Sequence, residues 1–265
     1  MKVPNVPDQD QELGVQVAQQ SNLAVEIPAE VAEMFNIADN MEGVVPRLPQ
    51  IAIIHAGQLF EMPDESKVET FEGIILDQHP ANAWWKPKEE GEGAGDKEKN
   101  KVPNCYSMNA ITPDDRCENK QNDKCGDCNQ NQFGSDSKTG KGKACKNMKR
   151  LHILMEGSLL PRRLTIPPTS IKSFEYYMTG LVDRGLPYPT VVSVFSLDKK
   201  EVAEFKYSEV KIIKNRVLVR EELIAVAGFI KQYKDAARQQ EINKEEYESE
   251  EPTEKPDISE PDIPF

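Results

Sequence analysis

Short runs of β-branched and aromatic residues recur along the middle of the chain, each bounded by glycine, proline or charged residues. Runs of this kind predict strands, and they cover residues 49–54, 71–77, 151–155, 163–166, 190–197 and 203–213. Apolar residues at helical spacing predict two longer helices, over 170–183 and 220–240, and a short one over 27–38. About six strands with few helices between them favour a mostly antiparallel sheet or small barrel with peripheral helices.

Charge is distributed unevenly along the 265 residues, whose formal net charge is −12. Residues 1–45 hold one basic and eight acidic side chains, and residues 241–265 hold two basic and ten acidic ones, so residues 46–240 carry a net charge of +3. Nucleic-acid binding through bulk basicity is thereby excluded, and only local basic clusters are informative. We expect an acidic N-terminal arm (1–45) that includes the short helix, one domain (46–240) and an acidic tail (241–265), with both termini disordered by composition.

The sequence lacks the apolar segments that would direct the protein to a membrane or out of the cell. No run approaches the ~18 apolar residues of a membrane helix, and the first ten residues turn acidic without the apolar core of a secretory signal. We therefore expect a cytoplasmic protein with no membrane partner. In a reducing cytoplasm, cysteines that gather in one segment favour metal binding over disulfides.

All five cysteines fall between Cys105 and Cys145, within a segment (102–150) that has too little aliphatic material for a core of its own. Cys125 and Cys128 form a C-x₂-C pair, the spacing with which two thiolates bind one zinc ion. Cys145 is expected as the third ligand and Cys105 as the fourth, with Cys117 as the alternative to Cys105. The segment is therefore predicted to be a zinc-binding insert that holds one structural zinc per chain.

A catalytic zinc is not expected, because His55, His79 and His152 lie outside this segment and form no zinc-enzyme motif. We interpret each of these histidines as an ordinary sheet or loop residue. Asp114-Asp115 is the candidate acidic pair for a catalytic divalent metal, and we interpret it as a turn.

Basic and aromatic residues near the cysteines predict contacts to single-stranded nucleic acid. Residues 138–150 contain six basic residues and no acidic one, which suits contact to a phosphate backbone, and Trp84-Trp85 beside Lys86 suit stacking on unpaired bases. A solvated basic hairpin and a buried tryptophan pair are the alternatives. The predicted contacts are Trp84, Trp85, Lys86, Tyr106, Phe133, Lys141, Lys143, Lys146, Lys149, Arg150, Arg162 and Arg163.

The acidic tail ends in Asp262-Ile263-Pro264-Phe265. This ending resembles the tails of bacterial single-stranded DNA-binding proteins, and the cysteine segment resembles, more loosely, phage and mobile-element single-stranded DNA-binding proteins with a zinc insert. The resemblance implies an OB-fold body that binds and protects single-stranded DNA in a bacterial or phage-infected bacterial cell. It also implies that residues 262–265 recruit replication, recombination and repair proteins. The body does not follow the bacterial family's sequence.

We therefore expect a non-enzymatic protein that binds single-stranded DNA largely without sequence specificity. Its fold would be mostly β, an OB-fold-like barrel with a zinc-binding insertion, peripheral helices and disordered termini. A recombination mediator or strand-annealing protein is the first alternative, and a zinc-containing enzyme such as a nuclease is the second. The sequence leaves the oligomeric state open, and a homo-oligomer is compatible with it.

Overall fold

The computed structural model describes residues 47–55, 57–87, 102–137, 140–202, 205–238 and 242. The chain divides into two compact units, Met1–Arg47 and Leu48–Phe265, and every element described below belongs to the second. In chain order the elements are β1 (Gln50–Ile54), β2 (Leu59–Glu61), β3 (Lys67–Val68), β4 (Thr70–Trp84), β5 (Cys105–Ser107), η3 (Asn129–Asn131), β6 (Lys146–Leu154), β7 (Arg162–Ile166), η4 (Pro168–Ser170), α3 (Ile171–Asp183), η5 (Tyr188–Thr190), β8 (Val191–Val202), β9 (Phe205–Val217) and α4 (Arg220–Arg238).

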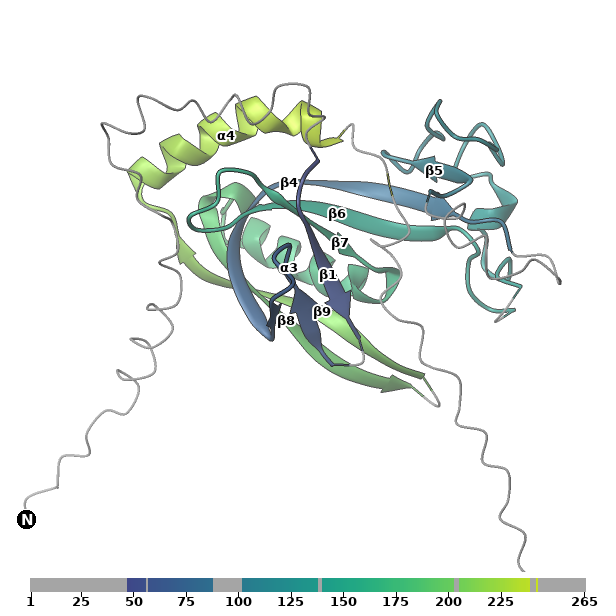
Figure 1. The fold of residues 1–265 in the computed structure, drawn as a ribbon, viewed down its shortest axis with the longest axis horizontal. Helices are drawn as coiled ribbons and strands as arrows, with labels where there is room; N and C mark the ends of the chain where they lie inside the picture. The colour runs from purple at the N-terminus through teal and green to yellow at the C-terminus, as the bar shows by residue number, and fades with distance from the viewer. Residues whose placement is uncertain are drawn as a thin grey trace, which may run out of the picture. The chain divides into compact units, whose positions relative to one another are not determined.

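The described strands form one nine-stranded sheet. Its order is β3-β2-β1-β7-β6-β4-β8-β9, and β5 pairs with β4 outside this path. All pairs are antiparallel except β1 with β7, where Gln50 lies opposite Arg163 in a parallel register. The sheet is open and strongly curled into a half-barrel (Figure 1). The prediction of a mostly β protein with peripheral helices is therefore confirmed at this level.

The inner face of the curled sheet holds the main hydrophobic core, because apolar residues alternate along its strands. The Phe71 and Phe195 rings are nearly parallel with centroids 4.7 Å apart, and Phe60 meets Phe71 edge-on at 4.9 Å. Helix α3 adds Phe174 to the same cluster. The other buried members are Ile51, Ile53, Met62, Ile75, Leu151, Ile153, Leu164, Ile166, Val210 and Ile212.

The outer face of β4 and β6 is also buried, and it carries two smaller apolar clusters. Under α4, Leu76 packs with Val226. Further along, Ala81 and Ala83 pack with a second group that includes Ile242. The two clusters lie on either side of a polar stretch of the same face, which forms one of the candidate sites described below.

All six predicted strands and both longer helices are confirmed, with differences at their ends. The prediction missed the second half of β4, because its sequence from Gln78 to Asn82 is polar and includes Pro80. Proline is tolerated there because β4 pairs with β8 only at residues 70–73 and with β5 only at 82–84, so one side of Pro80 has no ladder to interrupt. The short strands β2, β3 and β5 were also missed.

Several predicted features lie outside the described residues. They are the N-terminal arm with its helix over 27–38, and the tail apart from Ile242, including the tip at 262–265. Within the described residues, no helix combines the length and apolar content that crossing a bilayer requires.

Candidate metal centres and nucleic-acid interface

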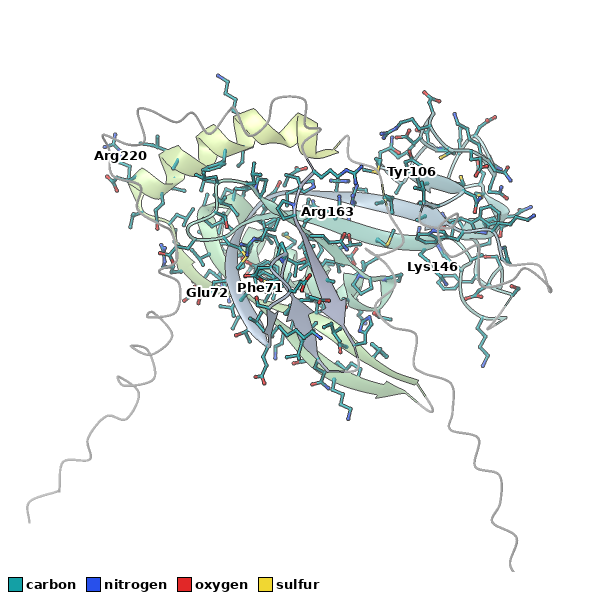
Figure 2. The ribbon with its side chains drawn as sticks, viewed as in Figure 1. Phe71, Glu72, Tyr106, Lys146, Arg163 and Arg220 are labelled. Atoms are coloured by element: carbon teal, nitrogen blue, oxygen red, sulfur yellow. The ribbon has the colours of Figure 1, made fainter. Side chains whose placement is uncertain are left out.

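The segment between β4 and β6 forms a cysteine-rich lobe, here residues 102–145, at the end of the β4–β6 pair. Strand β5 attaches the lobe to β4 through the Trp84↔Cys105 register. Polar side chains satisfy its backbone: Asn109 Oδ1 accepts hydrogen bonds from the N–H groups of Ile111 and Thr112 at 2.8 and 3.0 Å. Figure 2 shows Tyr106 and Lys146 at this end of the pair, while Phe71 and Glu72 lie at the other. The lobe is thus held by hydrogen bonds more than by an apolar core.

Four cysteines line one small cavity of about 20 Å³ in this lobe: Cys105, Cys125, Cys128 and Cys145. Cys105 is half-buried and the other three are buried. Backbone hydrogen bonds bring their loops together, since the Cys125 N–H donates to Ile111 O at 2.9 Å and the Cys145 N–H donates to Gln130 O at 2.7 Å. The structure therefore gathers the four cysteines that the spacing indicated around one space.

Cys117 lies close to Cys105 but does not line this cavity. Its Sγ accepts a hydrogen bond from the Tyr106 N–H at 3.1 Å and donates one to the Tyr106 carbonyl oxygen at 3.2 Å. The side chain also packs against the cluster of Ala81 and Tyr106. Cys117 is therefore held next to Cys105 but outside the lining of the cavity.

Two of the thiols around the cavity, those of Cys105 and Cys145, are held in their neutral form. Burial raises the pKa of the Cys105 thiol to about 11 and that of Cys145 to about 12, and neighbouring cysteines act in the same direction. A hydrogen bond from the Gln121 backbone lowers the pKa of Cys105 and so opposes this effect. Because metals bind the thiolate form, a cation in the cavity would relieve the cost of ionising these groups.

A second group of metal-ligating side chains is buried on the outer face of β4 and β6, and the sequence did not predict it. Asp77 Oδ2 lies 3.8 Å from Nδ1 of His79 and 3.8 Å from Nδ1 of His152. The three side chains are 2%, 4% and 1% exposed, and the two imidazole centroids are 5.4 Å apart. Burial lowers the pKa of His152, which the Asp77 carboxylate opposes.

The donor atoms of this group all lie within 4.8 Å of one another. The interpretation of His79 and His152 as ordinary sheet residues missed this juxtaposition. Asp77-x-His79 was the one available signal, because alternate residues of a strand share a face. The partner His152 is 73 residues further along the chain than His79, and only the strand pairing brings it to the group.

The candidate DNA contacts on the lobe surface centre on Phe133, whose side chain is 82% exposed. The Lys143 ammonium lies 5.0 Å from the centroid of its ring and donates to Asn131 Oδ1 at 3.3 Å. Lys141 is exposed nearby in sequence, and Lys146 is half-buried in an ion pair with Asp136 at 3.2 Å. The exposed Phe133 and the half-buried Lys143 therefore form an aromatic and cationic pair on the lobe.

The remaining candidates with accessible side chains lie on the strands and at their ends. Lys86, just after β4, is exposed, and Trp85, Lys149 and Arg162 are half-buried. Arg162 Nη1 also contacts Met155 Sδ at 2.7 Å.

Four predicted DNA contacts are corrected by their burial. Trp84, Tyr106, Arg150 and Arg163 are only 6%, 2%, 0% and 6% exposed. Tyr106 packs in the cluster with Ala83, Arg150 Nη1 contacts Met108 Sδ at 3.6 Å, and Arg163 Nη2 donates to the Gln50 side chain at 3.1 Å. Strand alternation turns these side chains to covered faces, so we remove them from the set of direct contacts. For Trp84, the alternative prediction of a buried tryptophan is confirmed.

The acidic pair Asp114-Asp115 is engaged by neighbouring cations. Asp114 accepts two hydrogen bonds from the Arg116 guanidinium, at 2.8 and 3.0 Å, which hold the pKa of its carboxyl below the ordinary value. Asp115 lies 2.6 Å from the Lys120 ammonium. Asp114 O also accepts the Cys117 N–H at 3.2 Å, so the pair sits at a turn, as expected.

No family model, curated protein or solved structure matches this chain.

Proposed function

We propose that this protein binds single-stranded DNA largely without sequence specificity, through the cysteine-rich lobe and the strand ends beside it. The curled sheet would serve as an OB-like body, and the tip at 262–265 would recruit replication and recombination proteins. The observation that carries the proposal is the Phe133–Lys143 pair: a phenylalanine ring that is 82% exposed with an ammonium 5.0 Å from its centroid.

This pair matches the chemistry of an unpaired nucleotide. An exposed ring offers a stacking surface to any base, and the lysine over the ring offers a charge to the adjoining phosphate. Leaving such a ring in water is unfavourable, because Phe133 gains nothing from burial. A ligand that covers the ring would recover that loss, and the basic run around Cys145 favours an anionic one.

We further propose that Cys105, Cys125, Cys128 and Cys145 hold one structural zinc. The donor set fits, since four cysteines share one cavity and thiolate ligands suit zinc. When bound, zinc would neutralise thiolate charge and cross-link the loops. Asn131 joins the two features, because its Nδ2 donates to Cys125 O at 2.8 Å while its Oδ1 accepts from Lys143. The cysteine loops would thereby position the ring and its lysine.

Fluorescence anisotropy with a labelled oligo-dT tests the proposal on the full chain. Base stacking is worth ~1–3 kcal/mol, so Phe133→Ala should weaken binding by about fivefold or more. Binding should also weaken as salt rises, because phosphate contacts release counterions. An affinity that is insensitive to salt, or equal for duplex and single strand, would overturn the proposal.

Tyr176→Ala is the matched control. Tyr176 is also an exposed ring, at 68%, with Lys172 Nζ 5.8 Å from its centroid, but it lies on α3 and not on the lobe. We expect the affinity of the Tyr176→Ala variant for oligo-dT to match that of the unaltered protein. Equal losses in the two variants would show that Phe133 has no particular role.

A further inference from the structure

We propose that Asp77, His79 and His152 bind a divalent transition metal ion that joins β4 to β6. This site is separate from the cysteine-rich lobe and does not depend on nucleic-acid binding. Its residues come from the outer face of the two central strands, and the donor atoms all lie within 4.8 Å of one another.

A bulge in β4 creates the site. The β4–β6 register shifts between Ile75 and Asp77, so that Ile75 pairs with Ile153 but Asp77 pairs with His152. An extra residue in one strand changes which face the following side chains occupy. Ile75 and Ile153 thus point into the main core, whereas Asp77, His79 and His152 share the outer face.

The distances between the donor atoms suit the coordination of one ion. Bonds of 2.0–2.1 Å place two tetrahedral ligand atoms about 3.4 Å apart, and the two carboxylate–imidazole distances are 3.8 Å. Small side-chain rotations would therefore complete the coordination. Both ring nitrogens of His152 are buried without a hydrogen bond among the described residues, an arrangement that is costly unless a partner such as a metal satisfies one of them.

The cover over the site favours a structural ion. Leu76 and its cluster pack beneath α4 on one side, and Ala81 and its cluster pack beneath Ile242 on the other. The three ligand side chains are at most 4% exposed. Beyond them, β4 continues to Trp84 and carries β5 with the cysteine-rich lobe, so the ion would brace the strands at the base of the lobe.

The neighbouring charges and the types of ligand atom determine which metal ions suit the group. Arg150 and Arg163 are buried on the same face, in register with His79 and His152. Arg150 contacts Met108 and Arg163 contacts Gln50, and both positive charges disfavour a dication. With Asp77 as the one carboxylate in the group, the ions that require several oxygen ligands, Mg²⁺ and Ca²⁺, are excluded. Two imidazoles and one carboxylate suit Zn²⁺, Co²⁺ or Fe²⁺.

Cobalt substitution in the full chain tests this site apart from the cysteines. A Co²⁺–thiolate centre shows strong charge-transfer absorption in the near ultraviolet, whereas an imidazole–carboxylate centre shows only weaker visible bands. In Cys125→Ser/Cys128→Ser protein we expect one Co²⁺ per chain with visible bands and no thiolate band. Adding His152→Asn should abolish that binding. Absence of Co²⁺ from the cysteine variant, or its persistence after His152→Asn, would overturn the proposal.

Two further variants keep the test decisive. His55→Asn removes a histidine that lies outside the group, and it should leave the cobalt bands unchanged; their loss would count against the assignment. Asp77→Asn preserves the side-chain shape while removing the charge, so it replaces His152→Asn if that variant fails to fold. We expect it to lower the Co²⁺ affinity at least tenfold, and unchanged affinity would refute the role of Asp77.

Discussion

The backbone N–H of Ser208 donates a hydrogen bond to Nδ1 of His55 at 3.2 Å, and the Ser208 hydroxyl donates to the His55 carbonyl oxygen at 3.2 Å. These bonds connect the edge strand β9 to the turn after β1, where no ladder joins the two strands. Ser170 Oγ accepts the Val210 N–H at 2.9 Å in the same way. Side chains therefore span the open seam of the half-barrel.

This seam should be sensitive to acid. Burial lowers the pKa of His55, so the unfolded chain binds a proton more readily than the folded one, and stability falls as the pH drops below the ordinary value of about 6.5. His55→Phe should remove this contribution and cost about 1 kcal/mol at neutral pH by leaving the Ser208 N–H without its acceptor.

Urea unfolding of both proteins at pH 7.5 and pH 5 measures the effect. The difference in unfolding free energy between the unaltered protein and His55→Phe should shrink at the lower pH. The contribution of His152 cancels in this comparison, because both proteins retain it. A constant difference at the two pH values would contradict the prediction.

Serine substitutions of the cysteines should fall into two classes, according to whether the variant protein keeps its zinc. Cys128 lines the shared cavity, whereas Cys117 is held by the Tyr106 backbone outside it. We expect Cys128→Ser to lose the zinc of the lobe and to lower the melting temperature, and Cys117→Ser to keep the zinc. Native mass spectrometry measures the mass of each variant and so shows whether zinc is bound. Zinc loss in Cys117→Ser would instead make Cys117 a ligand.

Gly73 should resist substitution because β4 approaches β6 closely there. A Cβ at this position would lie 2.4 Å from Cγ2 of Ile153, and overpacking of this kind costs about 1–3 kcal/mol. Ile153→Leu removes that β-branch methyl, so it should lessen the cost of Gly73→Ala. Denaturant unfolding of the two single variants and the double variant tests whether the substitutions are coupled. If their changes in unfolding free energy simply add in the double variant, the prediction is wrong.

Gly180→Ala is the matched control for that substitution. Gly180 lies within α3, where an added Cβ would meet no atom within 4 Å apart from its chain neighbours and the backbone of its own helix. Alanine is favoured over glycine in a helix by about 1 kcal/mol. The same chemical change should therefore stabilise the protein at position 180 and destabilise it at position 73.

Ile242 should matter for stability although it lies at the start of the predicted acidic tail (241–265). It is fully buried against Ala81, Ala83, Tyr106 and Met148, and truncating a buried isoleucine costs about 2–5 kcal/mol. Ile242→Ala should therefore lower the thermal midpoint, while Ile111→Ala, at a position that is 66% exposed, should not. Equal thermal midpoints for Ile242→Ala and the unaltered protein would show that Ile242 adds no packing energy. Experiments on the tail should accordingly truncate the chain after residue 242.

The alternating runs in the sequence were sufficient to predict six strands and two helices, because burial of one face imposes a period that is visible locally. The second half of β4 carries no such period, since Gln78, Pro80 and Asn82 are polar or strand-breaking. It is a strand because β6 and β5 supply partners. Spacing likewise indicated that Cys125, Cys128 and Cys145 would gather, with Cys105 or Cys117 as the fourth. It did not predict the burial that raises the thiol pKa values of Cys105 and Cys145.

By itself, the sequence determined the mostly β class, the separation of charge between termini and body, and the grouping of cysteines in one segment. These properties depend on composition and on neighbours in the chain. The tertiary structure alone decided that Asp77, His79 and His152 meet, that Arg150 and Arg163 are covered, and that Phe133 is exposed. Those outcomes depend on strand register and on what packs over each face, and a one-residue bulge in β4 is enough to change them.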